Sequence, residues 1–196
     1  MVVKIICRSL LQETYELEDC HLFDSALSDK SSNYVKSTGM SMTHSTDHYI
    51  LSNTTANDFV NLVDGLDNVV FECDWSTQSD TYMNGLMCSD RQLEFYNNVA
   101  LLRGFDVGKG WCITIKHDDG RYTTLNETVV AYSKDTYNKL QMSINGDTII
   151  NKVYSSDGTE LYSRTVSKSI NNKYLSFFLG VANSSAYVKN IKVKAL

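Results

Sequence analysis

The stretch from Tyr137 to Thr165 constrains the fold of this chain more than any other. Polar and apolar residues alternate there, so that Leu140, Met142 and Ile144 share one face of an extended chain. Asn145–Gly146 follows, a pair that accepts the positive φ of a tight hairpin turn. A second apolar run follows at 148–154, then a second turn at 155–158 and a third run that starts at 161. We therefore expect an antiparallel meander of three strands.

Short runs of the same kind recur along the chain, bounded by Ser, Thr, Asn, Asp or Gly. The clearest central strand is 68–75, whose residues Val69, Phe71, Cys73 and Trp75 share the expected buried face. No amphipathic helix of ten residues is evident. Two packed antiparallel sheets are therefore expected, which makes the fold class all-β. The expected strands are 33–36, 39–43, 48–52, 58–63, 68–75, 85–88, 93–96, 99–103, 111–117, 121–125, 128–132, the meander, 174–181 and 187–195.

The same patterns predict part of the core and one long-range pairing. The last strand, 187–194, should lie in a sheet with a partner near the N-terminal third of the chain. The side chains expected to be buried are those of Phe71, Trp111, Leu140, Ile144, Phe178 and Val193.

The length of 196 residues suits one sandwich domain, 1–196, in which 1–30 is either an N-terminal extension or an edge strand. The net charge is −5 and the basic residues are scattered along the sequence, which argues against a nucleic-acid partner. No apolar run is long enough for a signal sequence or a membrane span, so membrane insertion is not expected.

The five cysteines are odd in number and contain no CxxC pair. This pattern disfavours both a disulfide framework and a zinc site. We expect most of them to be small buried apolar residues.

From Asn68 to Leu196, the order of strands and turns resembles the concanavalin A-like jelly roll of lectins, laminin G-like domains and carbohydrate-binding modules. The resemblance rests on the acidic strand ending in Trp75, the hairpin at Asn145–Gly146, the turn at Asp157–Gly158 and the closing strand Val188–Val193. It implies a two-sheet antiparallel jelly-roll sandwich whose partner is a glycan or a cell-surface glycoconjugate. Homo-oligomer formation stays open.

The composition is rich in Asn and Tyr and contains no proline. In this respect the chain is similar to viral tail proteins and surface adhesins. The similarity implies a module of a larger protein that is extracellular, at a cell surface or on a virion.

Glu72 and Asp74 alternate with Cys73, which places both carboxylates on one strand face. Two carboxylates are what glycoside hydrolysis needs, and the segment resembles the acidic strand of laminarinase-like jelly-roll hydrolases. The second Glu of that motif is missing, because Trp75 and Ser76 follow. We therefore expect glycan binding and assign no catalytic residue.

Further ligand-binding residues are expected beside this pair. Tyr82 and Tyr96 lie near turns and could stack on sugar rings, as could Tyr122. Thr114 and Lys116 could supply polar contacts. Both tryptophans share a strand face with aliphatic residues, which favours the core for them.

Calcium is common in carbohydrate-binding jelly rolls, and carboxylates are its ligands. The resemblance therefore makes Glu18, Asp19 and Asp24 candidate calcium ligands, against the alternative of a solvated acidic turn. His44 and His48 are four residues apart, too far along a strand to share an ion unless a turn intervenes.

The leading hypothesis is a non-catalytic carbohydrate-binding module. The alternatives are a jelly-roll glycoside hydrolase and a structural assembly module without ligand. These differ in what the outward sheet face should present: a polar binding surface, an additional carboxylate, or an apolar contact patch.

Overall fold

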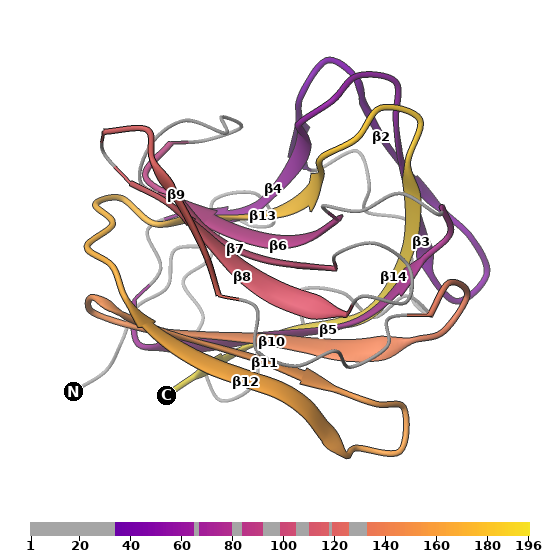
Figure 1. Cartoon of the computed structure of the whole chain (residues 1–196). Helices are drawn as coiled ribbons and strands as arrows, with labels where there is room; N and C mark the ends of the chain where they lie inside the picture. Colours follow the sequence, from indigo (N-terminus) through magenta and orange to yellow (C-terminus); the bar gives the residue numbers. More distant parts are fainter. Residues whose placement is uncertain are drawn as a thin grey trace, which may run out of the picture.

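The computed structural model describes residues 34–64, 67–79, 84–91, 99–104, 110–117, 119–125 and 133–196. Within these ranges fourteen strands form two seven-stranded antiparallel sheets that pack face to face (Figure 1). No described segment forms a helix that is long and apolar enough to cross a membrane. The expected all-β sandwich is confirmed.

Sheet A has the strand order β12-β11-β10-β5-β14-β3-β2. Its strands are β2 (Met40–His44), β3 (Tyr49–Asn53), β5 (Val69–Thr77), β10 (Asn138–Asn145), β11 (Thr148–Tyr154), β12 (Glu160–Ser167) and β14 (Ser185–Ala195).

Sheet B has the order β1-β4-β13-β6-β7-β8-β9. Its strands are β1 (Val35–Lys36), β4 (Asp58–Asp64), β6 (Asn84–Ser89), β7 (Val99–Gly104), β8 (Trp111–Lys116), β9 (Tyr122–Leu125) and β13 (Tyr174–Leu179). The expected strands at 93–96 and 128–132, and the segment 1–30, lie outside the described residues.

The expected meander is β10, β11 and β12, which pair in sequence order. Its first turn is tight, because Asn145 pairs directly with Thr148. Gly146 has a φ of 55°, and its N–H donates to Asp67 Oδ1 at 2.7 Å. The positive φ explains why a glycine stands in this turn.

We expect Gly146→Ala to destabilise the fold by about 1 kcal/mol. Space is not the cause, since a Cβ at this position would meet no atom within 4 Å. The cost comes from the left-handed backbone alone. Urea denaturation measures it, with Asp147→Ala as the control because Asp147 is exposed in the same turn and has no positive φ. An equal midpoint for the two variants would contradict this explanation.

All six side chains expected to be buried are buried. Five of them pack between the sheets, where the ring of Phe177 joins Phe71 and Trp75 at centroid distances of 6.1 and 5.7 Å. Phe178 alternates with Phe177 and so points to the other side of sheet B, where it stacks on Phe59 at 5.3 Å. Sheet B is therefore buried on both sides at this point.

The last strand lies where the pattern placed it. β14 pairs with β5 over most of its length and with β3, in the N-terminal third, at its start. The described cysteines, Cys73, Cys88 and Cys112, are buried and form no disulfide. Burial raises the pKa of the Cys88 thiol to about 12 and that of Cys73 well above its usual value. All three are buried residues, as expected, and the raised pKa keeps Cys73 and Cys88 in the thiol form.

Candidate polar face on sheet A

Glu72 and Asp74 lie on β5, near the centre of sheet A (Figure 1). They alternate with Phe71, Cys73 and Trp75, whose side chains are buried between the sheets. Both carboxylates therefore point outward on the same face, as the alternation predicted. We call this outward surface the sheet A face.

Thr114 and Lys116 do not belong to this face, so the expected grouping of the four residues is wrong. Both lie on β8, which is a strand of sheet B. They alternate with the buried isoleucines of β8 and point away from the core on the opposite side of the sandwich. Period-two alternation separates the two faces of a strand, but it does not reveal to which sheet the strand belongs.

The structure gives Thr114 and Lys116 neighbours within sheet B. Thr114 is 3% exposed, and its Oγ1 lies 3.2 Å from Thr124 Oγ1. The ammonium of Lys116 lies 5.3 Å from the ring centroid of Tyr122, which is 56% exposed. Lys116 and Tyr122 thus form a cation–π pair on the opposite face.

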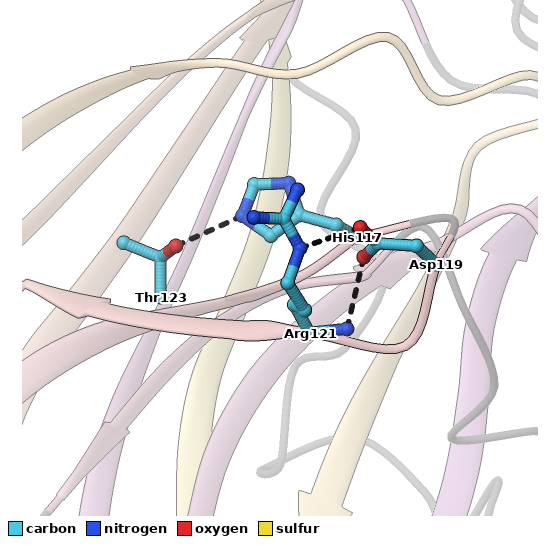
Figure 2. Close-up of polar contacts among 4 residues, drawn as sticks. All are labelled: His117, Asp119, Arg121 and Thr123. Carbon is cyan, nitrogen blue, oxygen red and sulfur yellow. Dashed lines mark hydrogen bonds and ion pairs between the residues drawn. The ribbon is translucent and has the colours of Figure 1, made fainter.

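The hairpin between β8 and β9 is closed by a local polar network (Figure 2). Asp119 accepts hydrogen bonds from the backbone N–H and the Nε of Arg121, at 3.0 and 2.5 Å. His117 Nε2 lies 2.9 Å from Thr123 Oγ1. The Arg121 donors hold the pKa of Asp119 below its usual value. These hydrogen bonds join residues of the hairpin to one another, so we assign them a structural role in the turn.

The remaining expected site residues are Tyr82, Tyr96, Glu18, Asp19 and Asp24, and all five lie outside the described residues. Within the described ranges, no three His, Cys, Asp or Glu side chains gather closely enough to hold a metal ion.

On the sheet A face, each central carboxylate has an amide partner. Gln141 Nε2 donates to Glu72 Oε1 at 2.7 Å, and Asn190 Nδ2 donates to Asp74 Oδ2 at 2.6 Å. Lys194 Nζ lies 3.7 Å from the second oxygen of Glu72. The two acids are thus held in fixed positions by side chains from the neighbouring strands.

Asn190 reaches Asp74 because of a β-bulge. The pairing of β14 with β5 shifts register between Lys189 and Lys192, and Asn190 has a φ of 51°. The two residues between the buried Val188 and Ile191 consequently both point outward. Asparagine tolerates this left-handed conformation better than most residues, which explains its presence here.

Aromatic rings gather at one end of the face. Tyr187 pairs with Ser76 on one side of β5, and Tyr137 lies on the other side, just before β10 begins. The ring of His48 lies 4.4 Å from that of Tyr187, and Lys189 Nζ lies 4.2 Å from the ring centroid of Tyr137. We call His48, Tyr137 and Tyr187 the aromatic end.

The surroundings of the aromatic end act on the phenol group of Tyr137. Partial burial raises the pKa of Tyr137, and the negative charge of Asp47 and Asp74 adds to the effect. His48 Nδ1 lies 2.6 Å from Asp47 Oδ1, and this hydrogen bond lowers the pKa of Asp47. Tyr137 therefore keeps its hydroxyl proton at neutral pH and can both donate and accept a hydrogen bond.

Sequence reasoning missed the aromatic end and the residues of the bulge. Tyr187 could have been found, because it alternates with Ala186 and Val188 and so must point outward. Tyr137 could have been found in the same way, because it lies two residues before the outward Lys139. The bulge at Asn190 breaks the alternation, so the outward position of Asn190 does not follow from a period-two pattern.

Comparison with known proteins gives the fold. No protein-family model and no curated protein matches the chain. A xylan β-1,4-xylosidase from Bacillus halodurans matches 94% of this chain and 41% of its own, with a TM-score of 0.68 and 13% identity. The carbohydrate-binding module CBM66 from Bacillus subtilis matches 83% and 95%, with a TM-score of 0.58 and 14% identity.

The exoplasmic/lumenal domain of VIP36, in a form bound to Ca²⁺ and Man3GlcNAc, matches 83% of this chain and 84% of its own, with a TM-score of 0.55 and 10% identity. At sequence identities this low, the similarity to these proteins shows a shared fold and nothing more. The chain is a two-sheet antiparallel jelly-roll sandwich, an architecture shared with carbohydrate-binding modules and lectins.

Proposed function

We propose that this chain is a non-catalytic carbohydrate-binding module and that glycan binds to the sheet A face. The observation that carries the proposal is the position of Tyr137 and Tyr187 on either side of β5, next to the hydrogen-bonded pair of Asp74 and Asn190. The fold supports the class, and these side chains supply the chemistry.

Each part of the face matches a part of a sugar. The apolar side of a pyranose packs on an aromatic ring, and its hydroxyl groups project at the edges. Asp74 and Glu72 can accept hydrogen bonds from such hydroxyls, and the amides of Asn190 and Gln141 can donate to them. Hydrogen bonds to a charged group contribute about 1.5 to 3 kcal/mol each. Because Gln141 and Asn190 already hold the two carboxylates in place, these side chains lose little further conformational freedom when a glycan binds.

The proposal also covers the location of the module and a bound calcium ion. It places the chain in a larger protein outside the cell or on a virion, where glycans are displayed. Calcium is included through Glu18, Asp19 and Asp24, because acidic side chains are the ligands that Ca²⁺ prefers.

A glycan array followed by calorimetric titration tests the function. We expect Tyr187→Ala, Tyr137→Ala and Asp74→Ala each to weaken binding of the best array hit about tenfold or more, the equivalent of about 1.4 kcal/mol. The matched control is Tyr122→Ala, which removes an exposed tyrosine with its own lysine partner from the opposite face. This control should bind like the parent.

Other outcomes would redirect the assignment. Loss of binding only in Tyr122→Ala would place the site on sheet B. The absence of any array hit, with and without added calcium, would favour the assembly module. Reducing ends released during incubation with the hit would favour a glycoside hydrolase.

A further inference from the structure

The outward positions of the strands of sheet A carry an excess of positive charge although the whole chain is acidic, with a net charge of −5. Among the described residues, the outward positions of its strands hold five lysines and only three carboxylates, and no arginine. The lysines are Lys139, Lys152, Lys189, Lys192 and Lys194, and the acids are Glu72, Asp74 and Glu160. Positive charge scattered along the sequence is thus gathered on one face by the fold.

The lysines flank the two central acids on both sides. Lys139 on β10 pairs with Asp74, and Lys192 on β14 pairs with Glu72. Because β10 and β14 are the two neighbours of β5, the two lysines are two strand spacings apart across the face and two residues apart along it, so their Cα atoms stand about 12 Å apart. Lys152 extends the positive charge on the β11 side, since it pairs with Gln141.

Three of the lysines have partners within the face. Lys152 Nζ lies 2.9 Å from Glu160 Oε2, Lys194 is near Glu72, and Lys189 lies over the ring of Tyr137. The side chains of Lys139 and Lys192 form no hydrogen bond or ion pair with the described residues. No described side chain therefore neutralises their ammonium groups, which stand one on each side of β5 and can pair with an anionic ligand.

We propose that the glycan bound by the sheet A face is an acidic polysaccharide, whose carboxylate or sulfate groups contact Lys139 and Lys192. This inference rests on the proposed function and specifies its ligand class. The central acids accept hydrogen bonds from neutral hydroxyls, and the lysines on both sides bind the anionic groups. A strand that alternates hydroxyls with spaced negative charges therefore matches the face.

A nucleic acid matches this arrangement less well. Its phosphates follow one another closely along the backbone, so some of them would lie against Glu72 and Asp74. Lysine also binds as a hydrated point charge, without the forked geometry with which arginine grips a phosphate. The face should therefore distinguish an acidic polysaccharide from a nucleic acid by the distance between successive negative charges on the ligand.

Binding is measured by calorimetry with polygalacturonate as the carboxylate probe, dextran sulfate as the sulfate probe, unmodified dextran as the neutral probe and a single-stranded oligonucleotide. We expect one or both acidic polysaccharides to bind more tightly than dextran and the oligonucleotide. Binding should weaken as salt rises from about 0.01 M to about 0.15 M, since the Debye length falls from roughly 30 to about 8 Å.

Lys139→Gln and Lys192→Gln should each weaken binding of the acidic probe about two- to fivefold at low salt. The double variant should lose most of the salt dependence. Lys173→Gln is the charge-matched control, because Lys173 lies just before β13 of sheet B. It should bind like the parent.

The outcomes separate this inference from the function on which it rests. If a neutral glycan binds best, loses affinity in Tyr187→Ala and is unaffected by the lysine substitutions, the acidic ligand class is wrong and the carbohydrate-binding function stands. If no glycan binds, charged or neutral, the function itself fails. Equal binding of the oligonucleotide and the acidic polysaccharides would overturn the inference in favour of non-specific attraction to polyanions.

Discussion

Ile144→Ala is expected to reduce the free energy of unfolding by about 2 to 5 kcal/mol. Ile144 is fully buried on β10, between Ile149 of β11 and Val69 of β5, which are fully buried as well. Truncation removes apolar contacts from three adjacent strands, and a rigid sheet can close the resulting cavity only in part. Urea denaturation monitored by tryptophan fluorescence measures the loss.

The control is Ile150→Ala, the same substitution on the adjacent strand of the same hairpin. Ile150 points outward and is only half-buried, because it follows the inward Ile149. Its truncation should cost about 1 kcal/mol or less, since little apolar area is withdrawn from water there. Similar losses in both variants would mean that the register of the meander is misread, because a slip by one residue exchanges the two faces.

The sequence contains enough local information to predict most of the strands. Alternation in β10 assigns Leu140, Met142 and Ile144 to the core, and Asn145–Gly146 marks the turn that sets the register with β11. Both are local effects, since one depends on the period of the strand and the other on the φ of a single residue.

The site could be predicted only in part, because it depends on pairing between distant strands. Glu72 and Asp74 were found from alternation within one strand. Thr114 and Lys116 have the same local pattern, yet β8 lies in the other sheet. The chemistry of Asp74 depends on a residue more than a hundred positions later, Asn190, which a bulge turns toward it.

The gathering of lysines on the sheet A face also depends on pairing between strands that are distant in the sequence. In the sequence, Lys139 and Lys192 are far apart, and their charges look scattered. In the fold they stand on either side of β5, because β10 and β14 both pair with it. A charge pattern across a sheet thus becomes visible only when the strand order is known.

Asn53 links the two sheets beside the end of β13. It is 4% exposed, at the end of β3 in sheet A. The two N–H groups of its Nδ2 are shared among the carbonyl oxygens of Thr55, Leu179 and Val181, which lie 2.6, 3.2 and 3.0 Å away. Its Oδ1 accepts from the buried N–H of Ser184 at 2.8 Å. One amide thereby satisfies backbone groups at the C-terminal end of β13 in sheet B and in the segment that leads to β14.

We expect Asn53→Ala to destabilise the fold by about 2 to 4 kcal/mol, because the buried N–H of Ser184 loses its acceptor and the carbonyls lose a shared donor. Asn138→Ala is the matched control: Asn138 is similarly buried, at 6% exposed, but the side-chain hydrogen bond it makes, to the carbonyl of Thr136, is long at 3.5 Å. The control should lose about 1 kcal/mol or less. Asn53→Asp should be at least as harmful as Asn53→Ala, because it turns a carboxylate oxygen toward three carbonyl oxygens. Urea midpoints that coincide for Asn53→Ala and Asn138→Ala would show that the link between the sheets does not depend on this amide.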